Sequence, residues 1–176
     1  IGKHEKWHLD EFILPSFVSN PQSGNLPQPV NNWLRDNIWR GYGIIQANPK
    51  KRFYISRAKA KTRRVLNEAE LLPILAKYGF EVVRPEEMTY QQQVQLFFDS
   101  EAVVAPHGAG LTNLLFSERC KVLELHPANL IKTHYFLLCK SLGFEYDAVV
   151  GSVGDRLENY TVDVQEVERW LGYFDE

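Results

Sequence analysis

The sequence has few cysteines and no long apolar run. Its 176 residues include two cysteines, Cys120 and Cys139, outside any CxxC pair and without a histidine pair at metal-ligand spacing. We therefore expect no zinc site, and we interpret both thiols as free and buried. No stretch approaches the roughly 18 consecutive apolar residues of a membrane-spanning helix. The sequence thus predicts neither a metal site nor a membrane span in this chain.

A strong charge of either sign is also lacking. The net charge is -2, with 44% hydrophobic and 24% charged residues, which is typical of a globular domain of ordinary size. This balance predicts no general attraction to nucleic acid or to an anionic membrane. The chain begins with Ile1 rather than an initiator methionine or a signal peptide, and we expect it to be a piece of a longer protein.

Two nucleotide-binding motifs are missing. No GxxxxGK segment is present, which argues against ATP bound by a P-loop. A GxGxxG fingerprint should follow the first strand, but the glycines here follow the third strand, and Asn113 stands where the third glycine would be. NAD is therefore disfavoured as well.

Short apolar strands alternate with longer amphipathic segments, which predicts a parallel sheet of about five strands with helices on both faces. We expect strands at 53–55, 81–84, 102–105, 121–125 and 144–150, with another possible at 12–14. Helices are expected at 30–40, 67–78, 89–98, 111–116, 131–142 and 164–174. We take 1–49 as an irregular segment plus a helix, linking to a further half of the protein, and 50–176 as the nucleotide-binding domain.

Details of the helices carry further expectations. Asn67 should cap its helix, with Glu70 completing a capping box. Pro73 is awkward inside that helix, so the helix could begin nearer Leu72. Tryptophans could stack on sugars, but the helical spacing of Trp33 favours a place in the core.

The segment HGAGLTN, residues 107–113, is the strongest candidate site. It joins an apolar strand to a helix start, where glycines permit close approach and free N–H groups attract anions. His107 could donate to a phosphate or a sugar hydroxyl, or equally be a structural histidine. In a sheet of order 2-1-3-4-5, this loop should meet the loop after Ile55 at the carboxyl edge of the strands.

The loop after Ile55 is basic, which suits a phosphate-bearing ligand. We interpret its lysines as solvated, whereas the rigid forks of the arginines suit paired phosphate oxygens. Nucleic acid is the rival explanation, which the charge of the rest of the chain opposes. The cations of residues 50–64 are Lys50, Lys51, Arg52, Arg57, Lys59, Lys61, Arg63 and Arg64.

Glu124 lies inside an apolar strand and needs a partner there. It could accept hydrogen bonds from ribose hydroxyls or pair with an arginine of the basic loop, and a structural ion pair is slightly favoured.

Several of these segments together resemble glycosyltransferase family 61. They are PHGAGLTN at 106–113, LEL at 123–125, ISR at 55–57, RRVLNE at 63–68 and VDV at 162–164. The resemblance extends from about residue 50 to 174 and implies the Rossmann-like C-terminal half of a GT-B enzyme, which binds the donor nucleotide. It carries a donor role over to Arg57, Arg63, Arg64, Asn67, His107, Gly108, Ala109, Gly110, Leu111, Thr112, Asn113 and Glu124.

The resemblance further implies an inverting transferase that uses a nucleoside diphosphate-sugar, with a UDP-sugar favoured and no metal required. The acceptor would be a glycan or a protein-linked hydroxyl, in polysaccharide biosynthesis, bound mostly by an N-terminal half of the same protein. His107 is a weak candidate for the catalytic base, which could lie outside this chain. A bacterial relative would be cytoplasmic, which we favour, and a eukaryotic one would lie in the secretory-pathway lumen.

Two other function classes remain open. The chain could be a non-catalytic Rossmann-like module that binds a nucleotide for regulation or assembly. An oxidoreductase is the third class, which the placement of the glycines opposes.

Overall fold

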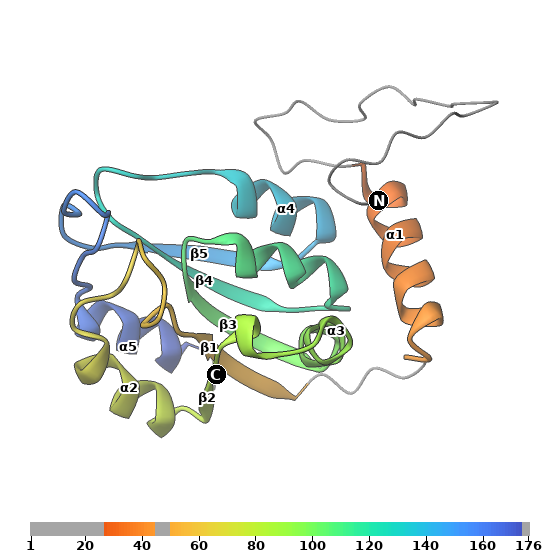
Figure 1. The fold of residues 1–176 in the computed structure, drawn as a ribbon, viewed down its shortest axis with the longest axis horizontal. Coiled ribbons are helices and arrows are strands. Elements are labelled where there is room, and N and C mark those ends of the chain that lie inside the picture. Colours follow the sequence, from red (N-terminus) through yellow and green to blue (C-terminus); the bar gives the residue numbers. More distant parts are fainter. Residues whose placement is uncertain (1–26, 45–49, 174–176) are drawn as a thin grey trace, which may run out of the picture.

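The computed structural model describes residues 27–44 and 50–173. Within them, a five-stranded sheet forms the centre of the molecule and helices lie against it (Figure 1). The strands are β1 (Lys51–Ile55), β2 (Phe80–Val83), β3 (Ser100–Pro106), β4 (Lys121–His126) and β5 (Glu145–Val150). The helices are α1 (Gln28–Gly41), α2 (Glu68–Lys77), α3 (Tyr90–Phe98), α4 (His134–Leu142) and α5 (Val164–Gly172), with 3₁₀ helices η1 (Pro85–Glu87) and η2 (Ala109–Phe116).

All strands of the sheet are parallel, in the order β2-β1-β3-β4-β5. Phe53 of β1 is in register with Val103 of β3, which is in register with Val122 of β4. The chain moves outward from β1 to β2 in one direction and from β3 to β5 in the other, so the order reverses between β1 and β3. The predicted α/β fold class and the predicted strand order are confirmed.

Each face of the sheet is covered by its own hydrophobic core. On one face, α2 and α5 bury Leu71, Leu75, Val167 and Leu171 against the strands. On the other face, α3, η2 and α4 form the second core, and α1 lies beside this layer. Trp39 of α1 packs against that core and donates through Nε1 to the Phe116 carbonyl at 3.0 Å. The central strands β3 and β4 are thus buried on both sides, which explains the apolar run of β3, whereas the edge strands β2 and β5 are partly exposed.

The structure differs from the sequence-based expectations at a few elements. The segment after β3 is a 3₁₀ helix that begins at Ala109, rather than a helix from 111. Helix α4 begins at His134, so the preceding apolar Ile131 lies exposed in a loop. Trp33 is 65% exposed, so its expected place in the core is wrong. Helix α2 begins at Glu68 and accommodates Pro73 in its interior.

Other expectations are confirmed. Both cysteines are free and buried. Gly79 and Gly143 directly follow the ranges expected for two helices, and they follow α2 and end α4 with φ of 77° and 76°, in the left-handed region that favours glycine. No helix among the described residues has the length and apolar character needed to cross a bilayer. The possible strand at 12–14 and the predicted end of the last helix at 174 lie outside the described residues.

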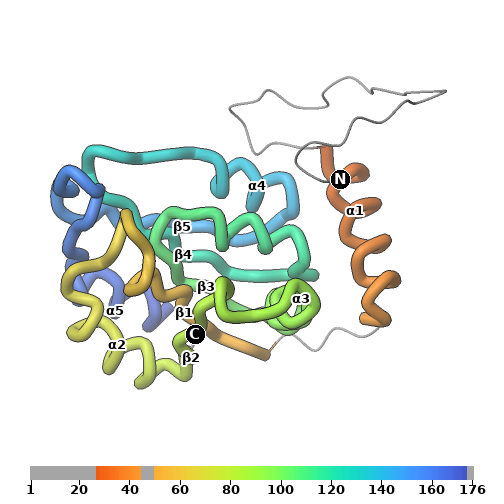
Figure 2. Tube along the Cα trace, in the orientation of Figure 1, coloured from red at the N-terminus to blue at the C-terminus, as the bar shows by residue number. Residues whose placement is uncertain are grey.

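The loops that follow the strands gather at the carboxyl edge of the sheet, at the left in Figure 2. Residues 56–67 follow β1, the HGAGLTN segment follows β3, residues 127–133 follow β4 and residues 151–163 follow β5. The two candidate loops therefore meet where the strand order reverses, which is the usual ligand position in such sheets.

Candidate functional site

A pocket of about 490 Å³ lies between the loops that follow β1 and β3. This volume is within the range of small-molecule sites, roughly 300–1,000 Å³. Residues after β2 and from α3 complete its wall. The pocket is lined by Ile55, Ser56, Arg57, Lys59, Ala60, Pro85, Glu86, Gln93, Ala109, Gly110 and Asn113.

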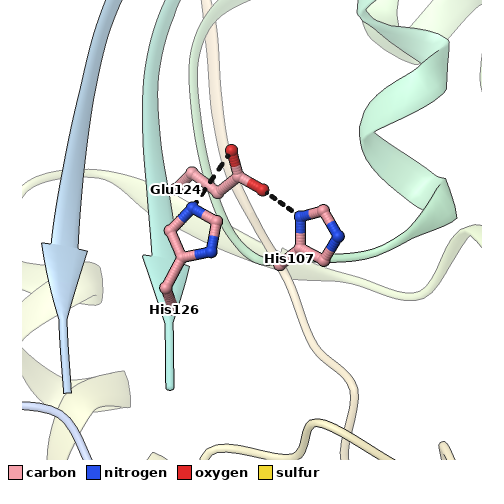
Figure 3. Close-up of side chains that lie close together, drawn as sticks. All are labelled: His107, Glu124 and His126. Carbon is pink, nitrogen blue, oxygen red and sulfur yellow. Dashed lines mark hydrogen bonds and ion pairs between the residues drawn. The ribbon is translucent and has the colours of Figure 1, made fainter. Parts of the chain in front are cut away.

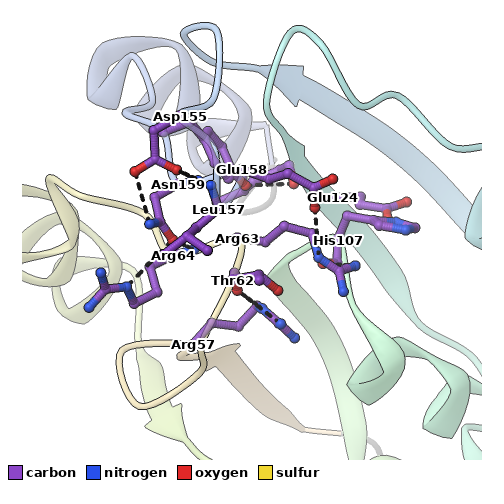
Figure 4. Close-up of polar contacts among 12 residues, drawn as sticks. Arg57, Thr62, Arg63, Arg64, His107, Glu124, Asp155, Leu157, Glu158 and Asn159 are labelled. Atoms are coloured by element: carbon purple, nitrogen blue, oxygen red, sulfur yellow. Dashed lines mark hydrogen bonds and ion pairs between the residues drawn. The ribbon is translucent and has the colours of Figure 1, made fainter.

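Arg57 is the cation that the loop after β1 brings against the start of η2. Its Nε and Nη2 donate to the Thr62 carbonyl at 3.3 and 3.0 Å, which fixes the plane of the guanidinium (Figure 4). Burial, followed by the nearby charge of Arg63, lowers the pKa of Arg57. A guanidinium remains charged at neutral pH even so. The loop thus holds a fixed positive charge at the pocket.

Gly108 is required for space rather than for an unusual backbone conformation. Its φ of 175° is extended, which any residue can adopt. A Cβ atom at this position would collide with Nη1 of Arg57. At Gly110, by contrast, a Cβ would meet Ile55 at 3.5 Å, an ordinary contact. The close approach indicated by the sequence is thus present at Gly108, and neither glycine has a φ in the left-handed region.

Arg63 joins three segments of the site. Its Nη1 donates to the carbonyl of His107 at 3.1 Å, and its Nε lies 3.6 Å from a carboxylate oxygen of Glu158. Both members of this ion pair have positive φ, 58° for Arg63 and 61° for Glu158, a conformation that costs a non-glycine residue roughly 1–3 kcal/mol. Arg63 thus ties the backbone of the HGAGLTN segment to the loop before α5.

Arg64 and Asn67 are not among the residues that line the pocket. The Arg64 guanidinium is turned away from His107, while its backbone N–H donates to Oδ1 of Asn159 at 3.0 Å (Figure 4). The Asn67 amide exchanges two hydrogen bonds, of 2.9 and 3.0 Å, with the backbone of Val162. Asn67 does occupy the cap position of α2, but its side chain makes no capping hydrogen bond, so the predicted capping box is wrong.

His107, Glu124 and His126 form a buried cluster at the ends of β3 and β4 (Figure 3). Nδ1 of His107 lies 2.5 Å from Oε1 of Glu124, and Nε2 of His126 lies 3.4 Å from Oε2. The imidazole rings of the two histidines stack with centroids 5.3 Å apart. Glu124 does have the partner that its burial demands, but this partner is a histidine rather than the arginine favoured from the sequence.

The Glu124 carboxylate is further stabilised by the Tyr146 hydroxyl, which donates to it at 2.7 Å. Burial raises the pKa of Glu124, but hydrogen bonds from His107, His126 and Tyr146 together outweigh burial and leave this pKa below its ordinary value. Burial and the neighbouring Glu124 raise the pKa of Tyr146. Glu124 is therefore an anion that accepts hydrogen bonds, and it holds the His107 proton on Nδ1.

The same cluster is the arrangement in the described residues that most resembles a metal site, since its ligand atoms lie within 4.8 Å of one another. Zinc–ligand bonds of 2.0–2.1 Å in a tetrahedron place ligand atoms about 3.3 Å apart. The 2.5 Å separation of His107 Nδ1 and Glu124 Oε1 is too short for that geometry. A hydrogen bond from Nδ1–H of His107 to Oε1 of Glu124 fits this pair better than a metal ion does.

The remaining predicted residues differ in what they offer a ligand. Ala109 is exposed and Gly110 partly so, and both line the pocket. Leu111 is fully buried in the core, so only its backbone could contact a ligand. The exposed Thr112 lies 3.4 Å, oxygen to oxygen, from the hydroxyl of Tyr135. Asn113 lines the pocket and donates to Gln93.

Several residues at the site were not indicated by the sequence. Gln93 is one of the polar residues of α3, and no sequence motif distinguishes it from its neighbours. His134 and Tyr135 begin α4, and their rings lie 6.2 and 5.4 Å from the His107 ring, centroid to centroid. His126 follows Glu124 by two positions on β4, whereas Tyr146 reaches Glu124 only through the pairing of β4 with β5.

Comparison with known proteins agrees with the resemblance found in the sequence. The glycosyltransferase 61 family model matches residues 7–123. The EGF domain-specific O-linked N-acetylglucosamine transferase of Drosophila melanogaster is 42% identical over 66 residues, which cover 36% of this chain and 12% of that protein. The chain thus spans a small part of the length of this relative. Because the family match includes more than half of its residues, the chain belongs to the glycosyltransferase 61 family.

Proposed function

We propose that this chain is the donor-binding part of an inverting glycosyltransferase that uses a nucleoside diphosphate-sugar, with UDP-N-acetylglucosamine as the first donor to test. The observation that carries the proposal is the contact between the Arg57 guanidinium and Gly108, at a pocket where the strand order reverses. A fixed cation beside the unpaired N–H groups of a helix start is suited to a diphosphate.

The reaction proposed is a direct displacement. The acceptor oxygen bonds to the anomeric carbon, the bond from that carbon to the diphosphate oxygen breaks, and the nucleoside diphosphate leaves with the electron pair. Negative charge develops on this leaving group, so Arg57 and the backbone of Gly108–Thr112 would lower the barrier. Arg63 and Arg64 would contribute positive potential around the pocket. A metal is not needed in this proposal, because the protein supplies the positive charge.

His107 has a restricted role in this scheme. Because Nδ1–H of His107 donates to Glu124, Nε2 is the acceptor in the neutral form of the imidazole, and in that form it can receive a hydrogen bond or a proton from a hydroxyl. It could therefore orient a sugar hydroxyl or, less directly, serve as the base. We favour the binding role, with the base and the acceptor site in another part of the protein.

The relative's name supports a proposal for the acceptor and the location. It specifies EGF domains as acceptors and O-linkage, which supports a protein hydroxyl over a growing polysaccharide as the acceptor here. Because that relative is an animal protein, the comparison gives no support to a bacterial cytoplasmic enzyme. We therefore propose the secretory-pathway lumen as the location and keep polysaccharide synthesis as the alternative.

Calorimetric titration with UDP, GDP, UDP-N-acetylglucosamine and NAD tests the donor site. We expect a nucleoside diphosphate to bind and Arg57→Ala to weaken it about 10–100-fold, since it loses a charge-assisted hydrogen bond. Arg57→Lys should recover little of the lost affinity, because an ammonium lacks the planar fork of donors that a guanidinium has. Lys61→Ala is the matched control, since it removes a cation from an exposed position in the same loop.

The outcomes separate the function classes. Preferential binding of NAD, or binding of no nucleotide, would overturn the transferase proposal. Nucleotide binding by this chain, together with no sugar transfer by the longer protein, would instead support the non-catalytic module.

A further inference from the structure

We propose that Asn113 turns its side-chain oxygen toward the nucleotide pocket and reads a hydrogen-bond donor of the bound nucleotide, and that Gln93 is the positioning residue that fixes this orientation. The inference rests on the proposed function, because it assigns a specificity role within the same pocket. Its basis is a chain of amide hydrogen bonds that runs from the backbone after β2, through α3, to η2.

The chain begins at the Gln93 side chain. Its Nε2 lies 2.8 Å from the Pro85 carbonyl oxygen and 3.3 Å from the Met88 carbonyl oxygen. Carbonyl oxygens only accept hydrogen bonds, so the nitrogen of the Gln93 amide must face them. Both of its hydrogens are used there, and the orientation of this amide is fixed by the backbone.

The orientation of Gln93 then determines that of Asn113. Oε1 of Gln93 lies 2.7 Å from Nδ2 of Asn113. An amide oxygen can only accept, so the Asn113 nitrogen must point toward Gln93, and the Asn113 oxygen must lie on the other side of the amide. Within residues 27–44 and 50–173 this oxygen has no hydrogen-bond partner. It is therefore the acceptor that Asn113 offers to the pocket.

The polar groups of the pocket include both a cation and hydrogen-bond acceptors, which is the combination that a nucleotide requires. Arg57 supplies the cation for the diphosphate, whereas Asn113 and the exposed carboxylate of Glu86 supply acceptors. The groups of UDP that can donate are the N3–H of the base and the ribose hydroxyls. An acceptor held in place by its neighbours discriminates against ligands that lack the matching donor, because the acceptor is then left unpaired.

The test uses UDP with two analogues, each of which lacks one of these kinds of donor. In 3-methyl-UDP the base N–H is blocked, and in 2′,3′-dideoxy-UDP both ribose hydroxyls are absent. We expect the wild-type protein to bind one of the two about tenfold more weakly than UDP. In Asn113→Ala this penalty should disappear, because UDP and that analogue bind equally once the acceptor is removed.

Gln93→Met tests the positioning role, since it keeps the length of the side chain and removes the amide. The Asn113 amide can then rotate, and the ratio of the two dissociation constants should fall toward one although Asn113 is intact. Because both ligands are measured on one preparation, a partly unfolded sample leaves the ratio unchanged. Gln91→Met, at an exposed position on the same helix, should keep the wild-type ratio.

The results separate this inference from the proposed function. Absence of UDP binding by the wild-type protein would overturn both. Intact UDP binding with an unchanged ratio in Asn113→Ala, or no penalty for either analogue, would overturn the inference alone. An unchanged ratio in Gln93→Met would remove the positioning role of that residue.

Discussion

His107 and Glu124 lie 17 positions apart in the sequence and share a hydrogen bond of 2.5 Å between Nδ1 and Oε1. His107 directly follows β3, Glu124 lies within the neighbouring parallel strand β4, and Tyr146 from β5 donates to the same carboxylate. A buried anion is thus held by polar partners from three neighbouring strands, and it fixes the tautomer of the histidine that begins the HGAGLTN segment.

Glu124→Gln should destabilise the protein at neutral pH by about 1–3 kcal/mol, since a buried charged acceptor is lost. The pKa of Glu124 is lowered in the folded state, so its stabilisation is fully present above the unfolded pKa of about 4.3. It is lost as the pH falls below that value toward the lower folded pKa. Urea titrations at pH 7 and pH 3 should therefore show the difference from wild type shrinking in acid.

The control for this experiment is Glu118→Gln, which changes an exposed carboxylate and should leave stability nearly unchanged at both pH values. A difference between wild type and Glu124→Gln that stays constant from pH 7 to pH 3 would contradict the assignment of Glu124 as a stabilised anion.

Gly108→Ala should weaken nucleoside diphosphate binding about tenfold or more while the protein remains folded. The added methyl group would displace the Arg57 guanidinium, whereas the extended backbone at this position accepts alanine without strain. Gly110→Ala adds the same group two residues later, where it makes ordinary contacts, and should lose less affinity. Calorimetry together with thermal unfolding checks both; equal losses would rule out the steric explanation.

Asn67→Ala should lower the free energy of unfolding by about 1–3 kcal/mol and leave the intrinsic nucleotide affinity of the folded fraction unchanged. The reason is that two hydrogen bonds to the buried Val162 backbone are lost. Asn129→Ala removes a similar pair of bonds to the backbone of Gly154 at an exposed site and should cost less. A loss of affinity without a loss of stability would instead restore Asn67 to the donor site.

Cys120 and Cys139 should not react with a thiol reagent such as DTNB at pH 8 until the protein unfolds. Burial raises the pKa of the Cys120 thiol to about 12, and it raises the pKa of Cys139 as well. The thiolate that would attack the reagent is therefore scarce and covered. Absorbance at 412 nm, with and without denaturant, measures the reaction; rapid reaction of the folded protein would contradict the buried positions.

The sequence was sufficient to predict the sheet and the meeting of the two loops that line the pocket. Apolar strands with regular spacing leave few topologies, and the strand order then determines which loops meet. Side-chain partners were harder to predict. Glu124 had an arginine-rich loop as an apparent partner, but His126 follows two residues later on the same strand and Tyr146 reaches it only through the register of β5.

The wrong expectation for Trp33 and the missed contacts of Gln93 also have local structural causes. Trp33 has the spacing of a core residue, but α1 lies at the side of the helical layer and leaves this position exposed. Gln93 stands among three consecutive glutamines on a helix, and nothing in the sequence distinguishes the one that contacts both the backbone and Asn113. Hydrophobic periodicity reports burial, and it carries no information on the direction of an amide.

The loop that carries Arg57 depends on residues far along the chain. Arg63 donates its backbone N–H to the Leu157 carbonyl, and Val65 forms a parallel bridge with Tyr160. The family match ends at residue 123, well before these partners. A protein shortened at that limit would retain every arginine and glycine of the nucleotide pocket and would lose the scaffold that shapes its basic wall. The smallest unit able to form the proposed donor site would therefore extend at least to Tyr160, and substitutions at 157–160 should be tested for effects on that site.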